Sequence, residues 1–176
     1  MSSSPFHVVI IGGGIGGLCL VQALKTAGVS VAVYELNPSP TDWLQVDLIN
    51  INPMGSRALH ECLPPALWEA FIAIASKPSA GFGFLTEQLK ELLVLDEALI
   101  SNGETSPDKT HHPVSRIVLR HILLAGLDDV IHFDKTFERY EQSSTGKVTA
   151  FFTDGSSTTG DVLVGADGAN SRIRKQ

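Results

Sequence analysis

Three glycines near the amino terminus have the spacing that lets a protein backbone hold a phosphate group. Gly12, Gly14 and Gly17 fit the pattern G-x-G-x-x-G, and Glu35 stands about 20 residues beyond them. In such a pattern the first glycine allows a tight turn, the second lets the backbone approach a pyrophosphate, and the third lets helix and strand pack closely. The phosphates meet amides at the start of a helix, and the acid accepts hydrogen bonds from an adenosine ribose. These residues therefore predict a site for a dinucleotide such as NAD or FAD.

A strand, a helix and a second strand surround these residues in the order that the pattern requires. Residues 6–11 form an apolar run rich in Val and Ile, typical of a strand that is buried on both faces. The stretch after Gly17 has apolar residues at helical spacing and stops at Gly28. Residues 29–34 read as a second strand that leads into Glu35. This complete unit favours a nucleotide site over a glycine turn that binds nothing.

The bulk composition fits one globular domain. The chain has 176 residues, of which 43% are hydrophobic and 18% are charged, enough to bury a core without disulfides or metals. Its formal net charge of −6 would repel nucleic acid and anionic membranes. The apolar run at 6–11 is too short to span a membrane. We expect a cytoplasmic protein with a small-molecule substrate, no nucleic-acid partner and no membrane span.

The cysteines and the paired histidines have plain structural interpretations. Cys19 and Cys62 fall in helix-like apolar stretches, which favours buried reduced thiols over a disulfide or a redox pair. His111 and His112 stand in a polar stretch that reads as a solvated loop, and adjacent side chains rarely share one metal ion. The sequence predicts no metal site.

A second helix, predicted over residues 114–127, carries a further candidate. Ser115 is its expected N-cap, which places Arg116 in the first turn. The helix dipole disfavours a cation there, so Arg116 is a candidate for binding a cofactor phosphate, against the alternative of a solvated surface side chain.

Three strands are predicted in the last third of the chain. They cover residues 130–142, 147–155 and 161–168, with the connection over 154–160 read as a turn region. The last strand ends at Asp167 in an Asp-Gly turn, after which a helix is expected to start.

With these segments the chain resembles the N-terminal part of the FAD-dependent monooxygenases of the para-hydroxybenzoate hydroxylase type. The resemblance covers nearly the whole chain in the family's order. Four stretches carry it: "IIGGGIGGL" at residues 10–18, "VYE" ending at Glu35, "RIVLRHIL" at residues 116–123 and "GADGANSRIR" at residues 165–174. The last is the most specific of the four.

The resemblance implies a fold and a cofactor. The fold is an α/β, Rossmann-like FAD-binding domain, a parallel sheet plus a β-meander, with the start of a substrate-domain sheet inserted. FAD would be bound at Gly12, Gly14, Gly17, Glu35, Arg116 and Asp167. NAD(P)H would be a transient co-substrate, because only one nucleotide pattern occurs.

The resemblance also implies an incomplete domain organisation. Residues 1–176 would form an FAD-binding domain that is truncated, with residues 81–113 as a partial substrate-domain insertion that supplies a first hairpin. Such a chain would leave sheet edges and apolar surface exposed. We expect it to bind FAD weakly by itself and to hydroxylate nothing efficiently.

The function that the resemblance implies is that of an FAD-dependent monooxygenase. It would use NAD(P)H and O₂ to hydroxylate a small aromatic or polyketide-type metabolite, or to oxygenate it in a Baeyer–Villiger reaction, in a secondary-metabolite pathway. No catalytic side chain is named, because the flavin performs the difficult steps. An inactive or regulatory FAD-binding fragment is one alternative. An NAD-dependent dehydrogenase is the other, disfavoured because neither Tyr34 nor Tyr140 has a Lys four positions on.

Overall fold

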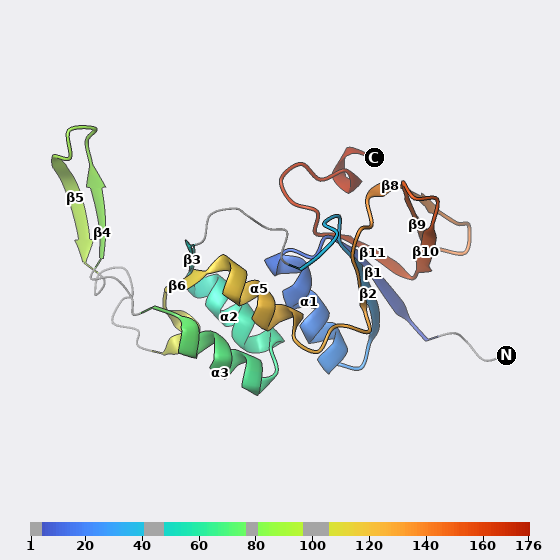
Figure 1. Ribbon diagram of the computed structural model, residues 1–176, viewed down its shortest axis with the longest axis horizontal. Helices are drawn as coiled ribbons and strands as arrows, with labels where there is room; N and C mark the ends of the chain where they lie inside the picture. Colours follow the sequence, from blue (N-terminus) through green and yellow to red (C-terminus); the bar gives the residue numbers. More distant parts are fainter. Residues whose placement is uncertain (1–4, 41–47, 77–80, 97–105) are drawn as a thin grey trace.

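Three layers make up the main body of the protein. The computed structural model describes residues 5–40, 48–76, 81–96 and 106–176. Helices form one outer layer, a parallel sheet lies in the middle, and a small antiparallel sheet covers the opposite face (Figure 1). A β-hairpin stands apart from these layers at the left of the same view.

The central sheet has four parallel strands in the order β11-β1-β2-β7. The strands are β1 (His7–Ile11), β2 (Ser30–Tyr34), β7 (Ile131–His132) and β11 (Val162–Gly165). Because all four run in one direction, their carboxyl ends meet at one edge of the sheet, where ligands of such folds bind. The predicted parallel sheet is confirmed.

Strand β1 separates two apolar cores, which explains its unbroken hydrophobic sequence. Val8 and Ile10 pack into the core beneath the helices. Val9 and Ile11 face the other way, into the core beneath the antiparallel sheet. All four are at most 5% exposed, so every position of the strand requires an apolar side chain.

The α-helices of the described ranges lie on one side of the sheet (Figure 1). They are α1 (Ile15–Thr26), α2 (Pro53–Cys62), α3 (Pro65–Ile74) and α5 (Arg116–Leu124). Helix α1 packs against β2, with α2 and α5 beside α1. Gly28 follows α1 with φ +71°, which a stop in the left-handed region requires. The Asn52 side chain caps α2 by accepting the Gly55 N–H at 2.8 Å.

The helix predicted over 114–127 is shorter than expected. Ser115 does cap it, accepting the Val118 N–H at 3.4 Å, and Arg116 does lie in its first turn. Val114 and Ser115 belong instead to β6 (His112–Ser115), which pairs antiparallel with β3 (Leu48–Ile51). Backbone pairing with β3 overrides the local helical pattern there.

The meander is confirmed, although its first strand was predicted as one piece. Residues 130–142 form two strands, β7 in the parallel sheet and β8 (Phe137–Gln142) in the antiparallel sheet. The chain turns between them at Asp134, which has φ +56°, because one straight strand cannot pair in both sheets. β8 then pairs with β9 (Val148–Phe152).

Two further expectations in this region were wrong. The predicted connection over 154–160 contains β10 (Ser157–Gly160), an edge strand whose Thr159 hydroxyl lies 2.8 Å from that of Thr149 on β9. β-branched residues suit such a half-solvated edge. No helix starts at Ala169, where the chain makes a turn and then the 3₁₀ helix η2 (Ile173–Lys175).

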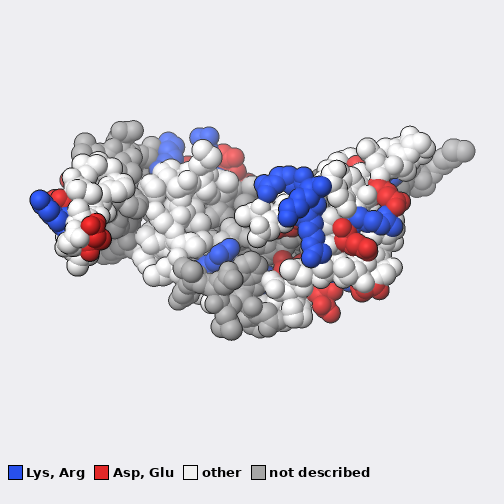
Figure 2. All heavy atoms as spheres, turned by 90° about the horizontal axis from the view of Figure 1, so that it is seen from above, with Lys and Arg blue, Asp and Glu red and all other residues white. Residues whose placement is uncertain are grey.

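The predicted hairpin is present within residues 81–113. It consists of β4 (Gly81–Leu85) and β5 (Glu91–Asp96), paired antiparallel; the same range also holds the 3₁₀ helix η1 (Pro107–Lys109) and the start of β6. Most of the described surface at the hairpin end is uncharged in Figure 2. Six of its apolar residues are at least half exposed: Phe84, Leu85, Leu89, Leu92, Leu93 and Val94.

Candidate functional site

The glycine turn lies at the carboxyl-terminal edge of the sheet, between two neighbouring strands. The Gly12 N–H donates to the Tyr34 carbonyl at the end of β2, at 2.8 Å. On the other side, the Ala166 N–H donates to the Ile11 carbonyl at 2.7 Å. The turn after β1 is therefore tied both to the end of β2 and to the Asp-Gly turn that follows β11.

Gly12 and Gly17 are required by close backbone contacts. Gly12 has φ +111°, and a Cβ placed on it would lie 2.3 Å from the Ala166 carbonyl oxygen and 2.8 Å from the Asp167 nitrogen. A Cβ on Gly17 would lie 2.1 Å from the Gly12 carbonyl oxygen. These two glycines thus let the first turn of α1, the loop after β1 and the loop after β11 converge without intervening side chains.

Gly14 differs from both, because the space beside it is open. A Cβ on Gly14 would meet no described atom within 4 Å, and its φ of −76° is one that any residue adopts. Gly14 is the N-cap of α1 and has no side chain to satisfy the amides of the first turn. Amides that point into open space at the positive end of a helix form an anion-binding position.

Glu35 is buried beneath this turn and holds its shape. The side chain is 4% exposed, and Oε2 accepts the Gly13 N–H at 2.6 Å. Oε1 accepts the backbone N–H of Asn37 at 3.0 Å and the Asn37 side-chain amide at 2.7 Å. A carboxylate offers about four acceptor positions, so these three donors leave room for a further hydroxyl.

An arginine that the sequence did not single out also reaches the glycine turn. Arg120 on α5 donates from Nε to the Gly13 carbonyl at 3.2 Å and from a terminal nitrogen to the Pro40 carbonyl at 2.5 Å. It is 4% exposed, and burial lowers its pKa while the nearby Glu35 carboxylate opposes that shift. The predicted Arg116 opens the same helix one turn earlier and is half-buried. Within the described contacts, Arg120 is the arginine at the turn.

Asp167 lies in the turn after β11, directly against Gly12. Its Oδ2 accepts the Arg172 N–H at 2.7 Å. Burial raises the pKa of this carboxyl, but hydrogen bonds from Ser171 and from the backbone outweigh that effect and leave the pKa below its usual value. Its other oxygen, Oδ1, is buried and has no hydrogen-bond partner among the described residues. Such an orphaned acceptor calls for a donor from outside the chain.

The structure brings five of the six predicted residues together. Gly12, Gly14, Gly17, Glu35 and Asp167 meet at one edge of the parallel sheet through the contacts above. The convergence of the last residue with the first was not visible in the sequence, because the two stand far apart along the chain.

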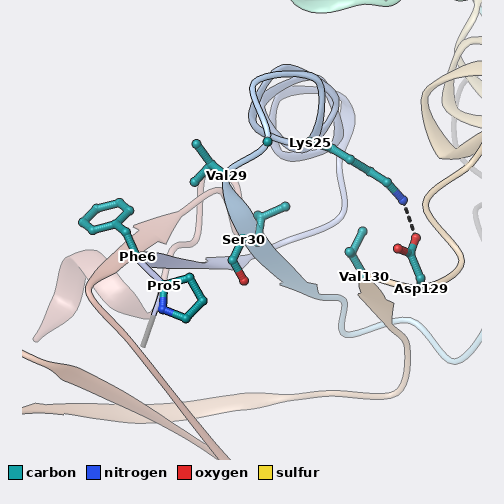
Figure 3. A pocket seen from close by; sticks show the side chains of 9 residues that line it. Pro5, Phe6, Lys25, Val29, Ser30, Asp129 and Val130 are labelled. Atoms are coloured by element: carbon teal, nitrogen blue, oxygen red, sulfur yellow. Dashed lines mark hydrogen bonds and ion pairs between the residues drawn. The ribbon is translucent and has the colours of Figure 1, made fainter. Parts of the chain in front are cut away.

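A separate hollow lies at the opposite end of the strands. It has a volume of about 490 Å³ and is lined by residues at the starts of β1 and β2, including Phe6 and Val29 (Figure 3). An ion pair between Lys25 and Asp129 closes one side of it. No residue of the glycine turn lines this hollow.

The sequence predicted that His111 and His112 both lie in a solvated loop, and for His112 this prediction was wrong. His112 is the first residue of β6, 6% exposed, with its ring against Phe71 at 5.2 Å between centroids. Its Nε2 lies 2.6 Å from the Pro107 carbonyl oxygen. The ring therefore belongs to the core beside α3.

Within the described ranges, the longest helix has 12 residues, too few to cross a bilayer.

Comparison with known proteins identifies a family of flavin-binding proteins. The family model for an FAD binding domain matches residues 6–176. The FAD-dependent monooxygenase dbaB of Emericella nidulans is 33% identical over 177 residues, which cover 99% of this chain and 43% of that protein. The chain thus spans about two fifths of this relative's length.

Solved structures agree in fold. A protein from Photorhabdus luminescens, assigned as an FAD-containing monooxygenase, superposes with a TM-score of 0.81 at 40% identity, covering 97% of this chain and 42% of that one. HpxO of Klebsiella pneumoniae, crystallised with FAD and uric acid, superposes with a TM-score of 0.74 at 27% identity, covering 94% and 40%.

Proposed function

This chain belongs to the family of FAD-binding domains, and from that premise we propose that it forms the flavin-binding part of a monooxygenase. The reaction would use NAD(P)H and O₂ to hydroxylate or otherwise oxygenate a small aromatic or polyketide-type metabolite in a secondary pathway of the cytoplasm. Support comes from a relative that is itself named an FAD-dependent monooxygenase and from a structural neighbour that holds uric acid. When bound, FAD accepts hydride from NAD(P)H and passes electrons to O₂.

The residues of the glycine turn fit such a cofactor. Open space beside Gly14 and the first amides of α1 suit a pyrophosphate. The remaining acceptor position of Glu35 suits a ribose hydroxyl, and the orphaned Oδ1 of Asp167 suits a hydroxyl of the ribityl chain. Arg116 is proposed to lie beside a flavin phosphate. The orphaned oxygen carries the argument, because the protein itself supplies no donor to it among the described residues.

The hairpin is proposed to contribute to the substrate side of the enzyme. β4 and β5 expose apolar side chains over most of their length, and residues 81–113 would then form part of a substrate domain. Such a wall would exclude water from an aromatic substrate. NAD(P)H is proposed to dock transiently, because the sequence has one glycine pattern of this type.

Gly14 allows a test that separates cofactor binding from folding. Gly14→Ala should fold normally, because its Cβ would meet no described atom and its backbone conformation is unstrained. The added methyl group would, however, occupy space proposed for the pyrophosphate. We expect FAD affinity, measured by quenching of flavin fluorescence, to fall at least about tenfold, which corresponds to about 1.4 kcal/mol.

Gly16→Ala is the matched control, because its Cβ also meets nothing and Gly16 is outside the pattern. It should bind FAD as the unchanged protein does. Equal affinity in both variants would argue against the proposed pyrophosphate position.

A second experiment tests the reaction. Anaerobic addition of NADH or NADPH should bleach the bound flavin; a flavin that neither nucleotide reduces would argue against the monooxygenase.

A further inference from the structure

The two cysteines of the chain lie side by side between two helices. Cys19 is in the second turn of α1, and Cys62 is the last residue of α2. The Cys19 Sγ lies 4.0 Å from the carbonyl oxygen of Ala58. In an α-helix that carbonyl points toward the residue four positions on, which is Cys62. Cys62 is therefore close enough to Cys19 to contribute to the raised pKa of the Cys19 thiol.

The environment of Cys19 disfavours loss of the proton from its thiol. Burial, together with the neighbouring Cys62, raises the pKa of Cys19 to about 12. The Cys19 thiol therefore keeps its proton at neutral pH and donates toward the Ala58 carbonyl oxygen. Both side chains are only partly buried, so a small molecule in water can reach them. Reactivity of a thiol pair depends on such access and on which sulfur loses its proton.

We propose that Cys19 and Cys62 form a two-electron oxidation site, which a hydroperoxide closes into a disulfide between α1 and α2. The Cys62 thiolate attacks one oxygen of hydrogen peroxide, so an S–O bond forms, the O–O bond breaks, and hydroxide takes up the released proton as water. The Cys19 sulfur then attacks the Cys62 sulfur; the S–S bond forms, the S–O bond breaks, and a second water leaves with the Cys19 proton. Two thiols lose two electrons and one peroxide gains them.

This site is distinct from the glycine turn and stands whether or not the chain binds FAD. Oxidation of this site should change the stability of the protein. A disulfide would join α1, which begins after Gly14, to α2, which begins after Asn52. It would also restrict the unfolded chain over the intervening residues. The oxidised protein should therefore resist unfolding more strongly than the reduced one.

The experiment counts thiols in a chain that has two cysteines. Fully reduced protein at low concentration is treated with a small excess of hydrogen peroxide and then denatured. Reaction with a thiol reagent should show two thiols before treatment and none after it. Intact mass should fall by two hydrogen atoms once methionine oxidation is resolved by peptide mapping, and a peptide joining residues 19 and 62 should appear. Dithiothreitol should restore both thiols.

Two variants assign the steps. Cys19→Ser should leave Cys62 to form a sulfenic acid, which dimedone traps as a mass adduct. Cys62→Ser should react with peroxide at least about tenfold more slowly, because the remaining thiol keeps its proton. The shift of the urea midpoint on oxidation should be absent from both. Retention of both thiols, independent oxygen addition to each sulfur, or cross-linking between chains instead of within one would overturn the proposal.

Discussion

Glu35 accepts the Gly13 N–H at 2.6 Å and thereby ties the end of β2 to the turn after β1. Both groups are buried, and the same carboxylate also holds Asn37 through its second oxygen. The acid assigned to the ribose is thus also part of the scaffold that shapes the glycine turn. Its removal should change stability and cofactor affinity together, whereas a replacement that still accepts hydrogen bonds should separate them.

Substitution of Glu35 tests this double role. Glu35→Ala leaves the buried Gly13 N–H without an acceptor, which costs about 1–3 kcal/mol of unfolding free energy. Glu35→Gln keeps one acceptor oxygen and should lose less than half as much. Both should weaken FAD binding, since each removes the charged acceptor. Urea unfolding and flavin titration measure the two effects; an alanine variant as stable as the parent would show that the bond is dispensable.

Gly12 should be intolerant of any side chain. Gly12→Ala combines a left-handed conformation with a Cβ placed 2.3 Å from the Ala166 carbonyl oxygen, so we expect a loss of about 3 kcal/mol or more. Gly146→Ala is the control, because Gly146 has φ +85° but open space around it. Its loss should stay near about 1 kcal/mol. Similar losses in a thermal or urea unfolding experiment would mean that the loop after β11 yields to the added methyl group.

The family resemblance and the α/β fold followed from local sequence patterns, and the comparisons confirm both. An apolar strand, glycines, a helix and a second strand are short-range signals, each readable within one element. The errors arose where pairing partners decide the structure. Residues 130–142 have the pattern of one strand, but the two halves pair in two different sheets. Val114 fits a helical pattern, but it pairs with β3 and is therefore part of a strand.

The site was predictable where it follows the glycine pattern and not where it depends on packing. Arg120 lies inside the stretch RIVLRHIL but was not singled out, although its position three residues before Leu123 on the buried face of α5 was a usable signal. The contact between Cys19 and Cys62 left no trace in the sequence, because it depends on how α1 and α2 pack. Both cysteines are free thiols, as the sequence predicted, but each is only partly buried.

Arg116 and Arg120 should respond differently to replacement by methionine. Arg120→Met removes donors to two backbone carbonyls in a buried position, so unfolding free energy should fall by about 2 kcal/mol. Arg116→Met should cost less than about 1 kcal/mol but should weaken FAD binding if Arg116 lies beside a phosphate. Unfolding and flavin titration of both variants distinguish the roles. A large stability loss at Arg116 with unchanged affinity would assign that residue to the scaffold alone.

Asp167 should make stability depend on pH in the acid range. Its pKa lies below the ordinary 3.8 in the folded protein, so the folded state binds the proton less readily than the unfolded state. The resulting stabilisation is fully present above 3.8 and is lost as pH falls through the lower, folded value. Asp167→Asn should lower the urea midpoint at pH 7, and its difference from the parent should shrink as pH falls below 3.8. The exposed Asp128→Asn is the control; a pH-independent difference at Asp167 would point to packing instead of charge.

The hairpin should drive self-association of this chain. Phe84 and Leu93 stand opposite each other on β4 and β5 and are 55% and 50% exposed; apolar edges of this kind pair with other molecules. The double substitution Phe84→Ser and Leu93→Lys should lower light scattering at high protein concentration and leave the urea midpoint of the main body unchanged, because the described contacts of β4 and β5 are chiefly with each other. Met54→Gln on α2 removes a single apolar side chain that is 81% exposed and should leave scattering unchanged. If Met54→Gln reduces scattering as much as the hairpin variant does, association depends on total exposed apolar surface and the hairpin has no special part in it.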